Sequence, residues 1–584
     1  MRECMRLALF VMLVAALVVA ACGPAPTPEV VDPVEAEPAE PTEVAEPEEP
    51  VEPTEEPEPV DTPVPEGPRS GGRVVVAHRQ EPDRFWAPFS GLTVAHEVGR
   101  IMNHTLIGTN ADLEYFPILV EEVPTVENGG ISEDSLVWTL RIREDVRWHD
   151  GEPFRPEDVC FTYETIMLEG TDVRSRVGWN RIEQCTVQEP NTVVFEFSEV
   201  DAPFLFRLTT VEILPEHILG GLTAEEVNGH EWMRAPVGTG PFMFKEWAGG
   251  DHITVVRNPH YFVEGQPYLD EIIYRIVPDA NTLLNMTETG AVDVQFRVQD
   301  DLALLIDDMA DVERITIQSL TPWLVWMNNN HPLFQDVRTR QALAYGFDKQ
   351  VICDRIFRGL SEPADGPVSP LIQWAHNPDI AVFRHDPERA KALLEEAGWV
   401  DEGGDGIRVA RGVQGVEDGT RFSFETANIA GEQVRIDLLS LIHAQWREVG
   451  VEAEINLVDV GTLFGDMLPN NRFETAYSYI GRYADPDFGG LFLDREEFGN
   501  MANYTGYSNP EVDDLILKSQ QTADLQERGQ YLREAQALIA EEVPVFFLGW
   551  LATTTALNQR VQGYSPDASG YGEMWNIREW WVQE

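Results

Sequence analysis

A segment rich in proline and acidic residues, 23–68, divides the chain and limits what can fold. Its 46 residues include 14 prolines and 15 acidic residues but no lysine, arginine or aromatic residue. Such a composition cannot bury enough apolar surface to offset the ordering entropy, and its like charges favour extension. We therefore predict a disordered tether over residues 22–70, with a folded body from residue 71 to 584.

The first 21 residues have the pattern of an export signal. Arg2 and Arg6 precede an apolar run of 14 residues, 7–20, which is too short to span a bilayer core of about 30 Å. The run ends in Val-Ala-Ala followed by Cys22, which resembles a bacterial lipobox. The resemblance implies a lipoprotein signal peptide over 1–21, acylation of Cys22 and a lipid-anchored, extracytoplasmic location. The alternative is an ordinary signal peptide with an accidental cysteine.

The charge of the chain excludes several functions. There are 100 acidic and 42 basic residues, so the formal net charge is −58, and a basic surface for nucleic-acid binding is excluded. None of the four lysines follows a glycine, so the chain has no Walker A loop and no P-loop ATPase activity of its own. No cofactor is indicated.

Three cysteines follow Cys22, namely Cys160, Cys185 and Cys353. In an oxidising compartment a Cys160–Cys185 disulfide is possible. Buried free thiols are an equally acceptable reading. No pair of cysteines has the spacing of metal ligands, so no metal site is predicted.

Helix and strand signals alternate through the body. Asp386 followed by a proline predicts an N-cap and the start of a helix, which Gly398 ends, and Asn509 precedes a proline in the same way. Apolar segments with strand-like patterns lie between such helices, at 192–197, 253–257 and 453–457. The alternation predicts a mixed α/β fold.

Residues 138–163, Trp-Thr-Leu-Arg-Ile-Arg-Glu-Asp-Val-Arg-Trp-His-Asp-Gly-Glu-Pro-Phe-Arg-Pro-Glu-Asp-Val-Cys-Phe-Thr-Tyr, resemble a family signature. The family is the peptide/nickel/oligopeptide class of ABC-transporter substrate-binding proteins, solute-binding family 5. Further motifs follow in the family's order, at 238–242, 257–261, 336–344, 386–399 and 485–487. The resemblance covers about residues 72–584.

The resemblance implies a two-lobed, venus-flytrap body of the periplasmic-binding-protein type II. The implied parts are lobe I (71–316 and 549–584, with a subdomain at about 110–235) and lobe II (317–548). Hinge crossings are expected near 316–323 and 548–551. The implied function is capture of a small polar solute, a peptide or an oligosaccharide, and its delivery to an ABC permease with a separate ATPase subunit. A monomer is expected.

Catalytic motifs are incomplete. His96 and His230 each begin a sequence like a helical zinc motif, but Arg100 and Arg234 stand where the second histidine ligand is required. No Gly-x-Ser-x-Gly elbow occurs. We predict that the protein is not an enzyme. The alternatives are a secreted carbohydrate-active enzyme and a solute sensor that docks a receptor.

Four candidate solute contacts come from the first strand and from aromatic residues near the predicted cleft. Glu81 and Phe85 follow the first strand, which points into the cleft in this family. Trp323 lies just beyond the expected hinge, and Trp374 lies in a loop bounded by proline and glycine. Each tryptophan could provide a rigid, flat binding surface, and core packing suits each of them equally well.

Three more candidates lie in residues 477–487. In peptide-binding relatives, a tryptophan here is followed by an aspartate that pairs with the α-amino group of the peptide. Tyr479 occupies the tryptophan position and Arg482 occupies the aspartate position. Arginine repels an ammonium and prefers a carboxylate, a phosphate or a sugar hydroxyl. Either Arg482 faces the solute, or it turns to solvent and Asp485 takes over the anchoring.

Overall fold

The computed structural model describes residues 67–583 except 189, 432, 480, 482–483, 501 and 570–571. The predicted signal peptide, Cys22 and most of the predicted tether lie outside the described residues, and so does Arg482. The described residues belong to one compact unit, 66–584. None of the helices found in them is both long and apolar enough to cross a membrane.

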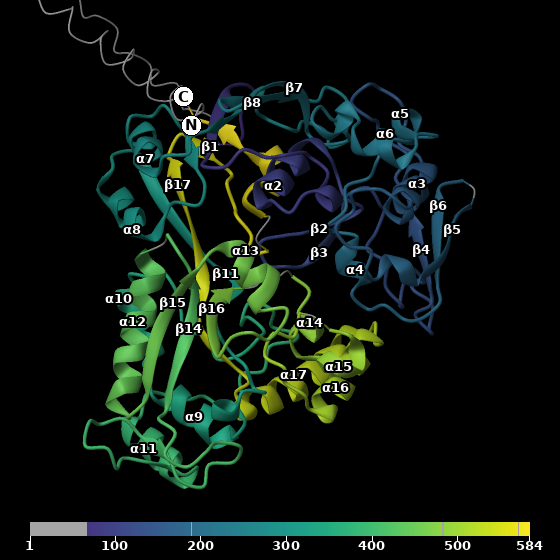
Figure 1. Ribbon diagram of the computed structural model, residues 1–584. Coiled ribbons are helices and arrows are strands. Elements are labelled where there is room, and N and C mark those ends of the chain that lie inside the picture. Colours follow the sequence, from purple (N-terminus) through teal and green to yellow (C-terminus); the bar gives the residue numbers. More distant parts are fainter. Residues whose placement is uncertain are drawn as a thin grey trace, which may run out of the picture. The chain divides into compact units, whose positions relative to one another are not determined.

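A ten-stranded sheet runs through both halves of this unit (Figure 1). The strand order is β15-β14-β16-β11-β17-β10-β1-β9-β8-β7. The strands are β15 (Glu452–Val458), β14 (Ser423–Ile429), β16 (Thr475–Tyr479), β11 (Val312–Met327), β17 (Val545–Asn558), β10 (Val294–Gln295), β1 (Arg73–His78), β9 (Glu271–Ile276), β8 (His252–Arg257) and β7 (Phe242–Ala248). The predicted strands at 192–197, 253–257 and 453–457 are all present, so the mixed α/β prediction is confirmed.

Two long antiparallel strands, β11 and β17, are shared by the two halves of the sheet. Residues 312–318 pair with 552–558 beside β10, whereas 324–326 pair with 545–547 beside β16. The pairing shifts register between Gln318 and Pro322 and again between Pro322 and Leu324. A proline has no N–H to donate to a ladder, so the pairing is interrupted there. The chain thus forms two lobes joined by a pair of strands.

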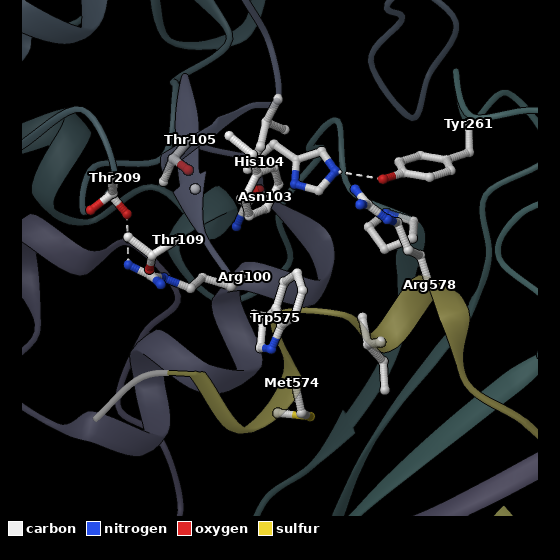
Figure 2. A pocket seen from close by; sticks show the side chains of 15 residues that line it. Arg100, Asn103, His104, Thr105, Thr109, Thr209, Tyr261, Met574, Trp575 and Arg578 are labelled. Carbon is white, nitrogen blue, oxygen red and sulfur yellow. Dashed lines mark hydrogen bonds between the residues drawn. The ribbon is translucent and has the colours of Figure 1, made fainter. Parts of the chain in front are cut away.

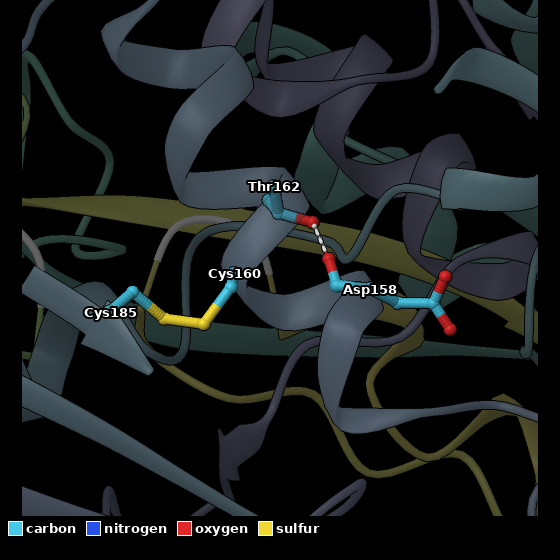
Figure 3. Close-up of a disulfide and its surroundings, with 4 residues drawn as sticks. All are labelled: Asp158, Cys160, Thr162 and Cys185. Carbon is cyan, nitrogen blue, oxygen red and sulfur yellow. Dashed lines mark hydrogen bonds between the residues drawn. A yellow bond between two sulfur atoms is a disulfide. The ribbon is translucent and has the colours of Figure 1, made fainter. Parts of the chain in front are cut away.

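Lobe I contains the parallel strands β1, β9 and β10 and a subdomain with its own core. The subdomain has a three-stranded sheet, β4 (Val137–Arg141), β6 (Thr192–Phe197) and β5 (Ile182–Gln188), covered by α3 (Pro156–Met167). Trp138, Trp148 and Phe204 are fully buried in its core. Cys160 of α3 and Cys185 of β5 form a disulfide (Figure 3), and Cys353 is a buried free thiol.

Lobe II has a core on each face of its sheet. Successive residues of a strand point to opposite faces, and along β11 Trp323 and Val325 enter one core while Leu324 and Trp326 enter the other. The first core is covered by α9 (Val337–Tyr345), α11 (Pro387–Glu396) and α12 (Gln433–Glu448). The second is covered by α14 (Gly489–Phe492), α16 (Pro510–Gln520) and α17 (Leu525–Glu542).

The helix starts predicted from sequence are confirmed. The Asp386 carboxylate accepts a hydrogen bond from the backbone N–H of Arg389 (3.0 Å) and caps α11. Asn509 caps α16 in the same way. The remaining α-helices are α2 (Thr93–Met102), α4 (Phe204–Arg207), α5 (Glu216–Leu219), α6 (Ala224–Asn228), α7 (Ala280–Glu288), α8 (Asp300–Ala303), α10 (Lys349–Arg355), α13 (Val460–Thr462) and α15 (Arg495–Phe498).

Candidate functional site

An aromatic cluster lies where β11 enters lobe II. It consists of Trp323, Phe357, Tyr477 and Tyr479, and Trp323 and Tyr479 are direct partners on β11 and β16. The Trp323 ring is stacked against Phe357 (centroids 5.8 Å apart) and Tyr477 (5.6 Å), while Tyr479 meets it edge to face at 5.0 Å. Tyr479 is 41% exposed and Trp323 only 9%. Tyr479 therefore offers the accessible ring of the cluster.

Tyr479 also interacts electrostatically with Arg297 of lobe I. Arg297 is the second residue after the end of β10 and has a left-handed backbone (φ 53°), which is uncommon for a residue with a side chain. Its guanidinium donates to the Glu97 carboxylate (2.7 Å) and lies 3.5 Å from Glu573. The exposed tyrosine of lobe II is thus near a group of interacting side chains in lobe I, Arg297 with the buried carboxyl groups of Glu97 and Glu573.

A second group on lobe II contains Trp374, Asp485 and Arg528. Arg528 donates two hydrogen bonds to the Asp485 carboxylate, both of 2.7 Å, and its guanidinium lies 5.7 Å from the centre of the Trp374 ring. Both charged side chains are almost fully buried. Burial raises the pKa of Tyr115 in lobe I, and the nearby Asp485 raises it further. The two lobes therefore meet here as well.

The expectation that Asp485 anchors an ammonium needs correction. Its carboxylate is already satisfied by Arg528, so a solute amine would have to compete with a buried, bidentate guanidinium. Trp374 is half-buried beside this ion pair, and it remains a candidate for solute contact.

Glu81 and Phe85 both contact Trp247 of lobe I, and Glu81 is half-buried whereas Phe85 is fully buried. Glu81 accepts hydrogen bonds from the Trp247 indole N–H (2.8 Å) and from the Gly250 N–H (3.2 Å). Phe85 has no exposed surface, and its ring lies 4.9 Å from that of Trp247. Phe85 is therefore a core residue of lobe I, because the chain after β1 turns this side chain inward.

A pocket on lobe I contains a cation that the sequence analysis missed, Arg174. The Arg174 pocket is bounded by the start of α2, the segment before it and residues near α4, and it encloses about 950 Å³, part of it open to solvent. Its lining residues include Ser90, His96, Trp179 and Phe206, and none of the lining residues is acidic. Phe206 also packs against the second core of lobe II. The pocket therefore adjoins a contact between the lobes.

Arg174 has no ion pair or side-chain hydrogen bond with any described residue. Its guanidinium packs over Gly91, where an added Cβ would lie only 2.5 Å from the nitrogen Nη1. Burial lowers the pKa of His96 to about 4, so this neighbour is neutral at physiological pH. The pocket thus presents one unpaired positive charge, an arrangement suited to a carboxylate.

The Cys160–Cys185 disulfide joins the ends of a loop that forms part of the wall of the Arg174 pocket. Cys160 and Cys185 are 25 residues apart in sequence, and Arg174, Ser175 and Trp179 lie between them. Figure 3 shows the disulfide beside Asp158, which is two residues before Cys160 on α3 and whose backbone carbonyl accepts a hydrogen bond from the hydroxyl of Thr162 (2.7 Å). No sequence motif identifies Arg174, because its role depends on how this loop is folded back onto lobe I.

A contact farther along the interface joins the lobes directly. The backbone N–H of Ala202 in lobe I donates to the carbonyl of Gln520 at the end of α16 (2.9 Å). Within the described residues, no group of three or more histidine, cysteine, aspartate or glutamate side chains is arranged to hold a metal ion. The fold and the interlobe site define a two-lobed solute-binding protein.

Comparisons with known proteins identify the family. The protein-family model described as "Bacterial extracellular solute-binding proteins, family 5 Middle" matches residues 115–495 of this chain. The chain therefore belongs to family 5 of the bacterial extracellular solute-binding proteins. Members of this family are binding proteins and not enzymes, so the corresponding expectation is confirmed.

Two relatives and two solved structures illustrate the similarity. The oligopeptide-binding protein AppA of Bacillus subtilis is 29% identical, over 88% of this chain and 92% of its own. The glutathione-binding protein GsiB of Salmonella typhimurium is 25% identical, over 82% and 88%. The structure of Bacillus subtilis AppA with a nonapeptide has a TM-score of 0.71 at 27% identity, covering 88% of this chain and all of AppA. Campylobacter jejuni NikZ with Ni(L-His) shares the fold, with a TM-score of 0.72 at 22% identity over 88% of this chain and 99% of NikZ. The expected two-lobed fold is confirmed.

Proposed function

We propose that the protein is the solute-binding subunit of an ABC importer and that it captures an oligopeptide between its two lobes. The observation that carries this proposal is the unpaired Arg174 in a pocket without acidic residues beside an interlobe contact. A peptide always brings a carboxylate, and an arginine binds a carboxylate by two parallel hydrogen bonds. The names of the relatives, oligopeptide-binding and glutathione-binding, agree with this solute class.

In the proposed arrangement the protein anchors the carboxyl end of the peptide, whereas the family pattern anchors the amino end. Asp485 is occupied by Arg528, so it is not available to an α-amino group. Arg482 stands at the position where relatives have the amine-pairing aspartate, and an arginine there would repel an ammonium. Recognition of the peptide carboxylate by Arg174, with Tyr479 packing on an apolar side chain, is the arrangement that we propose.

Capture requires the lobes to close over the solute. A solute that contacts both Arg174 of lobe I and Tyr479 of lobe II binds the closed state more tightly than the open state. Only such a difference in affinity can increase the population of the closed state. We propose that the bend occurs where β11 shifts register, between Gln318 and Leu324. Small-angle scattering of the protein with and without a bound peptide should then show compaction on binding.

We further propose that the protein is held at the outer face of a membrane by acylation of Cys22, with residues 22–70 as a spacer. The family is extracytoplasmic, which agrees with this location. The importer would supply a permease and a separate ATPase subunit, and the proline-rich spacer would let the body reach them.

Calorimetry with a mixed set of peptides and a set of oligosaccharides tests the solute class. We expect a peptide with a free carboxylate to bind, and its C-terminal amide to bind at least tenfold more weakly, a change of about 1.4 kcal/mol. Arg174→Gln should cause a similar loss. Arg141→Gln, an exposed arginine on β4, is the matched control and should leave affinity unchanged. Binding of oligosaccharides alone would contradict the proposal.

A further inference from the structure

The Arg174 pocket combines its cation with a largely apolar wall. The bulky apolar residues of its lining are Pro88, Ile166, Trp179, Phe206 and Val211. Apart from Arg174, the other lining residues are small or polar and carry no charge at physiological pH. A solute group that reaches the Arg174 guanidinium therefore lies beside apolar surface.

The apolar wall is fixed by the core of the lobe I subdomain. Ile166, Trp179 and Val211 are buried members of that core. Arg100 on α2 donates to the carbonyl of Thr209 (2.8 Å), two residues before Val211, and Figure 2 shows this contact. A surface that is already ordered loses little conformational entropy when a solute packs on it. The wall is thus preformed for a solute.

The Arg174 pocket has room for a whole amino-acid residue. The space available to a ligand inside it is about 350 Å³, whereas a benzene ring fits an apolar cavity of about 150 Å³. A large side chain and a carboxylate can therefore enter together. The recess lined by Thr209, between the end of α2 and the hairpin of β2 (Ile107–Thr109) and β3 (Tyr115–Pro117), offers about 50 Å³ (Figure 2) and is too small for such a residue.

Gly91 and Pro88 determine where the Arg174 guanidinium lies. The backbone N–H of Arg174 donates to the carbonyl of Pro88 (3.0 Å). The three atoms nearest to a Cβ added at Gly91 all belong to the Arg174 guanidinium, at 2.5 to 2.9 Å. The guanidinium therefore lies closer to this backbone than any side chain at position 91 would allow. A guanidinium held in one place offers a carboxylate a fixed pair of N–H donors.

We infer that the Arg174 pocket receives the last residue of the peptide, with the α-carboxylate at Arg174 and the side chain against the apolar wall, and that it selects a large apolar side chain there. The inference rests on the proposed capture of a peptide. A basic side chain would meet the Arg174 charge with no acid among the lining residues, and an acidic one would bring two carboxylates to one cation. Glycine or alanine would leave the apolar wall uncovered.

Peptides that differ at the last residue test this selectivity by calorimetry with the full chain. The set is Ala-Ala-Leu, Ala-Ala-Phe, Ala-Ala-Gly, Ala-Ala-Asp and Ala-Ala-Lys, with Leu-Ala-Ala as a control that has the composition of the first. We expect the peptides that end in leucine or phenylalanine to bind at least tenfold more tightly than each of the others, including Leu-Ala-Ala.

Two variants separate the carboxylate contact from the side-chain contact. Gly91→Ala should weaken every peptide about tenfold and keep the ratio between Ala-Ala-Leu and Ala-Ala-Gly, because the added Cβ displaces the Arg174 guanidinium. The backbone at Gly91 is not left-handed, so alanine fits the fold. Phe206→Ala should reduce that ratio to less than about threefold, because part of the apolar wall is lost. Gly229→Ala is the matched control and should bind like the parent, since its Cβ would meet only the Glu225 carbonyl, at 3.6 Å.

The outcomes distinguish this inference from the proposed function. Affinities of Ala-Ala-Leu and Ala-Ala-Gly within about threefold of each other would overturn the inference and leave peptide capture intact. Tighter binding of Ala-Ala-Asp than of Ala-Ala-Leu would also overturn it, because Arg174 would then hold a side-chain carboxylate. If none of the peptides binds, the proposed function fails and the inference fails with it.

Discussion

Asp485 and Arg528 are joined by two hydrogen bonds of 2.7 Å each, and both side chains are almost completely excluded from solvent. The pair links the loop after β16 to the helix α17, 43 residues farther along the chain. A buried charge without its partner is costly, whereas the intact pair contributes little beyond an apolar replacement. The pair therefore fixes the position of the loop that directly follows Tyr479, one of the proposed binding residues.

Replacing one member of this pair should destabilise the protein strongly. We expect Asp485→Asn to lower the free energy of unfolding by about 3–5 kcal/mol, because the Arg528 guanidinium would stay buried without a counter-charge. Glu402→Gln, which breaks the exposed Arg411–Glu402 pair, is the control and should cost less than about 1 kcal/mol. Urea unfolding of the three proteins measures the difference. Equal effects of the two substitutions would contradict the prediction.

Reduction of the disulfide should weaken both stability and solute binding. For a closed loop of 25 residues, loss of the cross-link is expected to cost about 3 kcal/mol. Peptide affinity should fall as well, because the loop carries Arg174 and Trp179. Calorimetry and thermal unfolding with and without reductant provide the measurement. The Cys160→Ser/Cys185→Ser variant is the control, since reductant should change nothing further in it.

The buried Glu573 carboxyl predicts a particular pH dependence. Burial raises its pKa from 4.5 to about 8, although Arg297 opposes the shift; Glu97 and Asp567 are nearby acids that add to it. The folded state therefore retains a proton that the unfolded state has released between about pH 4.5 and 8. The stability associated with this proton is complete below pH 4.5 and is lost as the pH rises towards and through 8, with a slope of up to about 1.4 kcal/mol per pH unit.

The Glu573→Gln variant tests whether the free energy of unfolding falls with rising pH because of this carboxyl group. The amide cannot release a proton, so the free energy of unfolding should fall less steeply with pH between about 5 and 8 than in the parent. Urea unfolding across that range gives both slopes. A variant with the same slope as the parent would show that Glu573 titrates normally in the folded state.

The exposed ring of Tyr479 should matter for solute affinity more than for stability. We expect Tyr479→Ala to weaken peptide binding about tenfold, because the largest accessible surface of the aromatic cluster is lost. Tyr479→Phe should retain most of the affinity if packing dominates. Tyr531→Ala, at a half-buried tyrosine on α17 whose hydroxyl donates to Glu527, is the control and should bind like the parent. Unchanged affinity of Tyr479→Ala would place the solute elsewhere.

Acylation of Cys22 predicts that the protein partitions with membranes. Two acyl chains anchor a protein stably, whereas one gives only marginal binding. Cys22→Ser should therefore release soluble protein into the extracytoplasmic fluid, and detergent phase partitioning measures the change. A variant that stays in the detergent phase would rule out this anchor.

Local signals in the sequence were sufficient to predict many of the helices and strands of the fold. The caps at Asp386 and Asn509 and the strand 192–197 depend on neighbouring residues, so their patterns are visible in the chain itself. Trp323 and Tyr479 were each proposed separately, and their pairing became visible only from the register of β11 and β16. Element positions are local properties, whereas strand register is not.

The parts of the candidate site that sequence could not provide are those set by distant partners. Asp485 looked available because Arg528 is 43 residues away in sequence. Phe85 looked like a cleft residue because its direction depends on how the chain turns after β1 and meets Trp247. Arg174 had no motif at all, since its exposure in a pocket follows from the folding of a disulfide-closed loop.

The two strands β11 and β17 have a practical consequence for sensing. In the described part of the chain, lobe II follows β10 and returns to lobe I through the partner strand, so it is one continuous insertion. Fluorophores attached to exposed sites on the two lobes would therefore change their separation when the proposed closure occurs. A solute-binding protein of this kind could in this way be converted into an optical reporter of the concentration of its solute, without any new contact being designed.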